Sequence, residues 1–129
     1  MKHKSKKLRW FLIAVLVLLV LRTGFYIKQI QGTSLTDALS RPNEITYVYK
    51  RGCPDCHRSN PYIFTLAFFS WRKVNFVAYH KTDAKKAQLI GLNSVPALIN
   101  QRQLLATNNS KQLMLFMLGK RHFEQLTNF

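Results

Sequence analysis

The chain opens with a basic head that is followed by a long apolar run. Residues 1–9 carry five Lys and Arg side chains, and residues 10–21 carry no charge. The apolar character continues past Arg22, so that the run over 10–27 has 18 residues. A membrane-spanning helix needs roughly 20 predominantly apolar residues, and a long side chain such as that of Arg22 can extend to the outer interface. The pattern therefore predicts one N-terminal transmembrane helix over residues 10–27.

The residues around this run predict its orientation. Trp10 and Tyr26 stand near its ends, where aromatic residues of spanning helices are enriched. The basic head, residues 1–9, predicts a cytoplasmic N-terminus and places the remainder of the chain outside. A cleaved signal peptide is an alternative, although no small-x-small cleavage motif follows Leu21. A buried core helix is the third interpretation.

After a polar connector over residues 28–43, short apolar runs alternate with turn residues. Within the connector a short helix is expected over 34–39, with Ser34 as its N-cap. Further on, β-branched and aromatic runs and the alternation in Val74–Tyr79 predict strands, and longer apolar runs predict helices. Thr82 is expected to cap the second of these helices. The predicted strands are 45–50, 74–79, 97–99 and 103–106, and the predicted helices are 54–71, 82–90 and 111–126.

This order of elements, β-α-β-α-β-β-α, defines an α/β domain over residues 44–129. The helix over 54–71 is apolar nearly all round, which is typical of a helix that is buried between a sheet and another layer. Strands joined through a helix are expected to be parallel, and the terminal hairpin is expected to be antiparallel. The sequence thus predicts a mixed four-stranded sheet with helices on both faces.

The two cysteines of the chain lie together in the segment Cys53-Pro54-Asp55-Cys56, between the first predicted strand and the helix that follows it. Closing a loop of two residues gains little stability, because the chain-entropy contribution of a disulfide rises with loop length. The spacing therefore favours a reactive pair over a structural disulfide. Outside the cytosol such a pair can persist in the oxidised form.

Together with two prolines, this motif gives residues 44–126 a resemblance to the thioredoxin superfamily. Pro61, five residues after the second cysteine, matches the proline that kinks the active-site helix of that family, and Val95-Pro96 matches its cis-proline. The anchored form, with the string Tyr47-Val48-Tyr49-x-x-x-Cys53-Pro54-x-Cys56, also resembles small exported thiol-disulfide oxidoreductases and bacteriocin-export accessory proteins of Gram-positive bacteria. The resemblance implies a minimal thioredoxin-like fold and a redox-active disulfide between Cys53 and Cys56.

The resemblance also implies distinct roles for the two sulfurs. Cys53 is expected to be the exposed nucleophile, because the unpaired amides and the dipole of a helix N-terminus favour a thiolate. Cys56 is expected to be the buried resolving thiol. Val95 and Pro96 are expected to bind substrate, since a proline has no N–H to donate and the backbone of Val95 is left to pair with an extended peptide.

Four residues are expected to support the pair, namely Pro54, Asp55, His57 and Pro61. Of these, His57 adds to the basic residues that flank Cys53 and favour its thiolate, whereas the carboxylate of Asp55 opposes them. Two positions depart from the thioredoxin pattern. Tyr47 stands where the thioredoxins proper have an acid beneath the second cysteine, and Gly52 stands where they have a tryptophan.

Charge and compartment limit the partners. The net charge is +15, and from residue 29 onward 13 basic side chains face five acidic ones, a net of +8. Nucleic acid is a usual partner for such a charge, but an exported domain meets anionic lipids and wall polymers instead, so no nucleic acid is expected. The predicted partners are cysteine-containing exported proteins or peptides and a redox-recycling partner. The prediction is a membrane-tethered extracytoplasmic thiol-disulfide oxidoreductase without a cofactor other than its own disulfide.

Three alternatives belong to other classes. Cys53-Pro-Asp-Cys56-His57 is also a C-x-x-C-H pattern, which attaches haem in c-type cytochromes. Met114, Met117, His80 or His122 would then supply the second axial ligand. A structural zinc site usually takes four ligands, and the second pair is missing, so no metal is expected. A redox-idle thioredoxin-like binding module is the last alternative.

Overall fold

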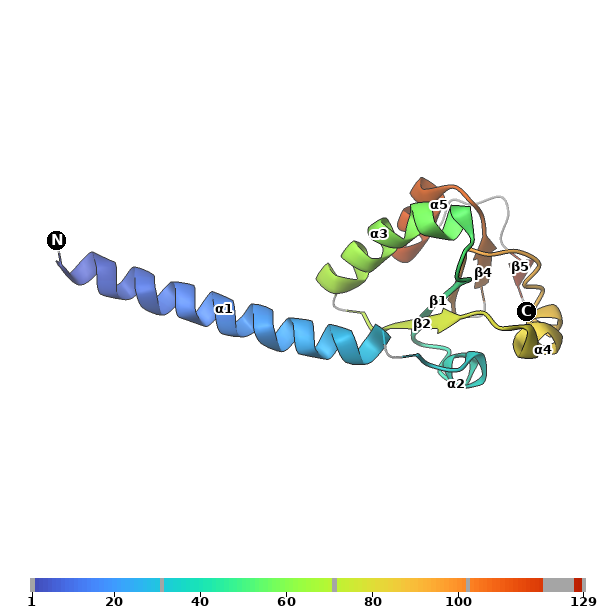
Figure 1. The fold of residues 1–129 in the computed structure, drawn as a ribbon, viewed down its shortest axis with the longest axis horizontal. Helices are drawn as coiled ribbons and strands as arrows, with labels where there is room; N and C mark the ends of the chain where they lie inside the picture. Colours follow the sequence, from blue (N-terminus) through green and yellow to red (C-terminus); the bar gives the residue numbers. More distant parts are fainter. Residues whose placement is uncertain (1, 31, 71, 102, 120–126, 129) are drawn as a thin grey trace.

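A sheet with the strand order β2-β1-β3-β4-β5 forms the centre of the domain in the computed structural model (Figure 1). The structure describes residues 2–30, 32–70, 72–101, 103–119 and 127–128. Four strands lie where the sequence predicts them, and the short fifth strand at the edge was not predicted. The strands are β1 Ile45–Tyr49, β2 Val74–Ala78, β3 Ala97–Asn100, β4 Gln103–Ala106 and β5 Thr127–Asn128.

The sheet is mixed, as predicted, but one strand direction differs from the expectation. β1 and β2 are parallel, and β3 and β4 form an antiparallel hairpin. β3 also runs antiparallel to β1, with Ala97 opposite Val48, although a helix precedes it. That helix, α4 (Ala84–Leu89), has six residues and is about 9 Å long. It therefore does not carry the chain back along the sheet, and β3 starts near the end at which β2 stops.

The helices cover both faces of the sheet, as the sequence predicts. On one face, buried residues of α3 and α5 pack on side chains such as Tyr47 and Phe76. On the other face, α2 and α4 pack on side chains such as Val48 and Val77. These pairs alternate along β1 and β2, because successive side chains of a strand point to opposite faces. The helices are α1 Lys2–Ile30, α2 Leu35–Leu39, α3 Pro54–Phe69, α4 Ala84–Leu89 and α5 Ser110–Met117.

The ends of three helices test the predicted caps and boundaries. Ser34 caps α2, and its Oγ accepts the backbone N–H of Asp37 at 3.2 Å, as predicted. Thr82 is not a cap, because it lies inside a 3-10 turn, Lys81–Asp83, that leads into α4. The last helix, α5, ends at Met117, and Gly119 follows with a φ of 78°, so the helix predicted over 111–126 is interrupted near Gly119, the position at which its sequence suggested a break.

Parts of that prediction lie outside the described residues, namely the side chains of Phe123 and Leu126 that were expected on the last helix. Trp71, which was expected to end α3, is also outside them. The connector is more than a linker, because Leu35 and Ala38 of α2 are buried in the core on the second face of the sheet.

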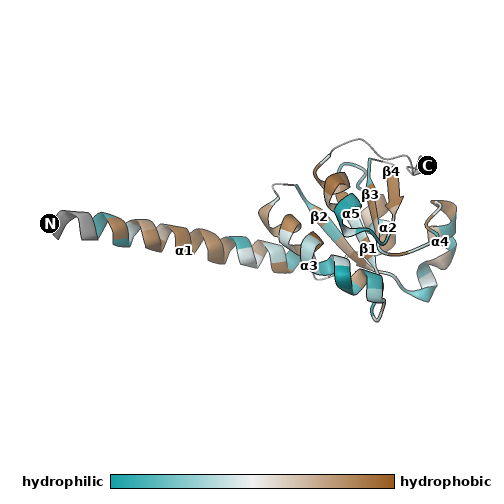
Figure 2. Cartoon of the chain, turned by 90° about the horizontal axis from the view of Figure 1, so that it is seen from above, coloured by the Kyte–Doolittle hydropathy of each residue, from teal (hydrophilic) through white to brown (hydrophobic). Residues whose placement is uncertain are grey.

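The N-terminal helix α1 is long and apolar enough to cross a membrane, judged by length and composition. Its 23-residue stretch Lys6–Lys28 is not buried in the protein, which does not fit the interpretation as a core helix. Figure 2 shows this apolar helix extending away from the domain. Among the described residues, its C-terminal part contacts the fold: Arg22 and Tyr26 bind backbone carbonyls of α3, and the ring of Tyr26 meets that of Phe76 in β2. Arg22 therefore binds protein groups instead of extending freely to the interface.

Candidate functional site

The two cysteines lie where β1 passes into α3. Gly52, with a φ of 76°, makes the turn, and this left-handed conformation is one that glycine adopts at no steric cost. Cys53 is the N-cap of α3, and its Sγ accepts the backbone N–H of Cys56 at 3.4 Å. Its carbonyl oxygen accepts the N–H of His57 at 3.0 Å. The sulfur of Cys53 therefore takes the place of the side-chain oxygen that commonly caps a helix.

A second loop lies beside this sulfur. The thiol of Cys53 contacts the carbonyl oxygen of Val95 at 3.9 Å, and the peptide bond between Val95 and Pro96 is cis. Pro96 is buried, and its carbonyl oxygen accepts the N–H of Thr107 at 3.3 Å. Val95 is half-buried. Residues 42 positions apart are thus brought together, with a backbone segment next to the accessible sulfur.

The two thiols have different environments. Cys53 is half-buried, whereas Cys56 is only 1% exposed, and neither is in a disulfide. Burial, followed by the hydrogen bond with Cys53, raises the pKa of the Cys56 thiol from 9.0 to about 12. The negative charges of Cys53 and Asp55 act in the same direction. At neutral pH Cys56 is therefore a neutral thiol beneath the sulfur that solvent reaches.

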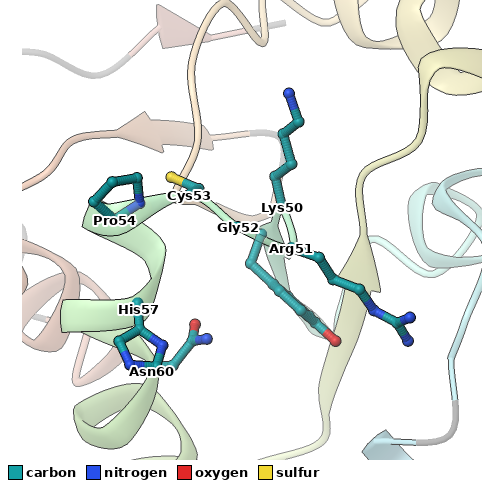
Figure 3. Close-up of a pocket in the computed structure, with 8 residues that line it drawn as sticks. Lys50, Arg51, Gly52, Cys53, Pro54, His57 and Asn60 are labelled. Carbon is teal, nitrogen blue, oxygen red and sulfur yellow. The ribbon is translucent and has the colours of Figure 1, made fainter.

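A shallow groove of about 430 Å³ opens beside Cys53 (Figure 3). It is lined by the turn itself and by His57 and Asn60 of α3. In Figure 3 the side chains of Lys50 and Arg51 extend away from the Cys53 sulfur, while His57 lies beside Asn60. The cationic side chains that precede the motif therefore do not converge on the sulfur as expected. The N-terminus of α3 is the positive group that faces it most directly.

Tyr47, at the position of the thioredoxin acid, is fully buried and forms a polar contact beneath the site. Its hydroxyl donates a 2.8 Å hydrogen bond to Asn60 Oδ1, and its ring stacks on Tyr49 with centroids 5.8 Å apart. Burial, followed by the charges of Cys56 and Cys53, raises the pKa of Tyr47 well above its usual range. Tyr47 is therefore a neutral hydrogen-bond donor at the place of an acid.

Asn60 is the residue of the site that sequence reasoning missed. It follows Cys56 by four positions on α3, a spacing that places two residues on the same helix face. A polar residue at this spacing from a cysteine in a mostly apolar helix was the available signal. The role of Asn60 could not be inferred from α3 alone, because its hydrogen-bond partner Tyr47 lies in β1.

The residues expected to support the pair occupy different surroundings. Pro54 is exposed at the first turn of α3, where a missing N–H costs nothing. Asp55 is half-buried in the same turn, and His57 is exposed. Pro61 lies inside α3, which continues through it to Phe69, and its carbonyl oxygen accepts a 2.6 Å hydrogen bond from Thr65 Oγ1.

The haem hypothesis does not fit this structure. Cytochromes of that class are almost wholly helical, whereas this domain is built on a mixed sheet. Met117, one of the proposed axial ligands, is 4% exposed and belongs to the core beneath α3 and α5. His122, another proposed ligand, lies outside the described residues.

The comparisons with known proteins support the fold. No protein-family model and no curated protein sequence matches the chain. Among solved structures, the chain is similar to the crystal structure of the thioredoxin Mala s 13 of Malassezia sympodialis, with a TM-score of 0.50 and 13% sequence identity. The match covers 67% of this chain and 84% of that thioredoxin. The domain therefore has a thioredoxin-like fold.

Proposed function

We propose that this protein is a membrane-tethered thiol-disulfide oxidoreductase that exchanges disulfides with exported proteins through Cys53 and Cys56. The observation that carries the proposal is the unequal pair at the N-terminus of α3. One sulfur is accessible and lies 3.9 Å from the Val95 carbonyl oxygen, and the other is buried directly behind it. A structural disulfide has no need of this asymmetry.

The exchange begins with the Cys53 thiolate, which attacks one sulfur of a substrate disulfide. The substrate disulfide breaks, a Cys53–substrate disulfide forms, and the second substrate sulfur leaves as a thiolate that takes up a proton. Cys56 then loses its proton and attacks the Cys53 sulfur, which releases the first substrate sulfur as a thiol. The substrate has gained two electrons, and the protein has formed the Cys53–Cys56 disulfide. The same steps in reverse transfer a disulfide to a dithiol substrate.

The neighbouring groups have separate parts in this exchange. An extended substrate segment pairs with the backbone of Val95, next to the sulfur it reacts with, while Pro96 fixes the loop. Asp55 is the nearest carboxylate to the pair in the sequence and contributes to the raised pKa of Cys56. Tyr47 offers no carboxylate to accept the Cys56 proton, so deprotonation of Cys56 is the slow part of resolution.

The membrane tether determines which proteins the domain can meet as substrates. Residues 10–27 of helix α1 form the membrane span, the basic head at the start of this helix stays in the cytoplasm, and the thioredoxin-like domain lies outside the membrane. In that compartment the partners are cysteine-containing exported proteins or peptides and a separate redox partner that restores the Cys53–Cys56 pair. No cofactor is required, because the pair itself carries the two electrons.

Two serine variants test the proposal. The full chain with Cys53→Ser is expected to lose insulin disulfide exchange while it keeps the circular dichroism spectrum of the unchanged protein. Cys56→Ser is expected to accumulate mixed disulfides with exported proteins, which non-reducing gels and mass spectrometry identify. The matched control carries both Cys53→Ser and Cys56→Ser; it is expected to keep the fold, and it has no sulfur that could form a mixed disulfide. If Cys53→Ser retains exchange activity, the mechanism is wrong, and if Cys56→Ser traps nothing, a redox-idle binding module becomes the better account.

A further inference from the structure

Hydrogen bonds from Arg22 join the C-terminal end of α3 to the predicted membrane span. Arg22 Nε donates to the carbonyl oxygen of Phe68 at 2.8 Å, and Nη2 donates to those of Ala67 at 3.5 Å and Ser70. The last carbonyls of a helix lack partners within the helix and carry the negative end of its dipole. The charge of Arg22 is therefore matched by protein groups and does not need to reach water or a head group.

Aromatic side chains strengthen the same junction. The guanidinium of Arg22 lies 5.9 Å from the ring centroids of both Phe25 and Phe68. The ring of Tyr26 meets that of Phe68 edge-on at 5.4 Å, and its hydroxyl donates to the carbonyl oxygen of Phe64 at 2.8 Å. In Figure 1 the end of α3 accordingly lies over the C-terminal part of α1. This end of the domain is thus held at the level of Arg22 on the helix.

An apolar groove of about 560 Å³ lies between the two helices. Its lining is apolar except for Arg22, and Leu18 and Leu21 of the span continue directly into it. Phe69, on the α3 side, is 73% exposed, and Leu18 and Leu21 are each 65% exposed. The groove is therefore an extension of the exposed apolar surface of α1 onto the domain.

The length of the uncharged run explains why such an extension is useful. The uncharged residues 10–21 would cover about 18 Å as a helix, and the hydrocarbon core of a bilayer is about 30 Å thick, so the predicted span over 10–27, about 27 Å long, places Arg22 within the apolar layer. A charge in that layer costs free energy unless protein groups match it, as the carbonyl oxygens of α3 do for Arg22. Apolar side chains of the domain at the level of Arg22 to Phe25 would add to the surface that faces lipid.

We propose that the groove and Phe69 form a lipid-contact surface, in which acyl chains of outer-leaflet phospholipids occupy the groove and Arg22 holds the end of α3 against the bilayer. This inference rests on the tether in the proposed function. Basic side chains at the same junction favour an anionic membrane surface, because Lys28 lies in the last turn of α1 and the exposed Arg72 follows the end of α3, next to Lys73, which pairs with Glu44 at 3.4 Å. The membrane surface would then fix the orientation of the domain as well as its cellular location.

Fluorescence of single-tryptophan chains tests the surface directly. The full chain is reconstituted in phosphatidylcholine–phosphatidylglycerol vesicles whose acyl chains carry bromine, which quenches tryptophan on contact. One chain keeps Trp10 and carries Trp71→Phe. Two further chains carry Trp10→Phe and Trp71→Phe together with either Phe69→Trp or, as the matched control, Leu89→Trp. Leu89 is 83% exposed on α4, on the opposite face of the sheet.

The expected result is that the emission at position 69 falls as much as that at position 10, while the emission at position 89 is unchanged. If position 10 is quenched and position 69 is not, the lipid-contact surface is wrong and the tether stands. If position 10 is not quenched, the chain does not enter the bilayer, and both the tether and this inference fail.

A second pair of variants tests the role of Arg22. Arg22→Gln in the position-69 chain is expected to remove most of the quenching there, because the α3 carbonyls lose their cation. Lys85→Gln, which removes an exposed charge of α4 on the opposite face of the sheet, is expected to leave that quenching in place. Equal quenching in the Arg22→Gln chain would show that Arg22 does not hold the domain to the bilayer.

Discussion

The difference between the two thiols predicts a large difference in their reaction with alkylating reagents. Folding raises the pKa of Cys56 from 9.0 to about 12. At pH 7 the thiolate fraction of such a group is about one in 10⁵, compared with about one in 10² for a cysteine whose pKa is 9.0. Because the thiolate is the reactive form, Cys56 is expected to react about a thousandfold more slowly than an ordinary cysteine.

The assay is alkylation of the fully reduced chain by iodoacetamide at pH 7, followed over time by mass spectrometry. One adduct is expected to form rapidly and to map to Cys53. The second, on Cys56, is expected to form slowly, with a rate that rises about tenfold for each unit of pH below the pKa. In urea the two sites are expected to react alike, because unfolding removes the burial that raises the pKa of Cys56.

The Cys53→Ser variant is the control that isolates Cys56. It removes the negative charge of Cys53, which raises the pKa of Cys56, but it leaves burial, the largest cause. Cys56 in this variant is therefore expected to react faster than in the unchanged chain and still far more slowly than in urea. Equal labelling of both cysteines in the folded protein, or labelling of Cys56 first, would refute the assignment of the two roles.

Four further predictions follow from individual contacts. Tyr47→Phe removes the donor to Asn60 and is expected to lower the free energy of unfolding by about 1 kcal/mol, measured in urea; an unchanged midpoint would show that the hydrogen bond adds no net stability. Ser34→Ala removes the cap of α2 and is expected to cost about 1 kcal/mol in the same assay, whereas no loss would mean that α2 needs no cap. The reduced protein is expected to lose stability as the pH rises from about 9 toward 12. Folding raises the pKa of Cys56 and of Tyr47, so the folded state keeps protons that the unfolded state releases, and a constant thermal midpoint over that range would contradict this linkage. A membrane-impermeant maleimide added to intact cells is expected to label Cys53, and labelling only after lysis would reverse the proposed orientation.

The sequence predicted the elements that have a local pattern. Alternation in Val74–Tyr79 placed β2 and its two faces correctly, because a strand with both faces covered still alternates between two separate cores. Ser34 was a correct cap because its hydrogen bond to Asp37 spans only three residues. The apolar surface of the helix after Cys56 correctly predicted that α3 packs on the sheet, but among the described residues the second layer expected on its outer side is not found there, since Tyr62 and Phe69 are 52% and 73% exposed.

The sequence did not predict features that depend on residues far apart in the chain. The direction of β3 depends on where α4 lies relative to the sheet, and no local pattern records this. Leu35 is buried because α2 packs on the second face of the sheet, whose strands follow it in the chain. The same holds for Arg22, whose carbonyl partners follow it by more than 40 positions. Asn60 acquires its place in the site only from the hydroxyl of Tyr47.

Helix α3 has Cys53 at its N-terminus and contacts Arg22 at its C-terminus, so the length of the helix sets the distance between these two residues. Its 16 residues span about 24 Å. With the tether in place, the reacting sulfur stands no farther than this above the level at which the chain leaves the lipid. A newly exported polypeptide reaches that height with about seven extended residues. A client cysteine that lies at least this far from its own membrane segment could therefore reach the height of Cys53, and the tether would favour such membrane-proximal cysteines over distant ones.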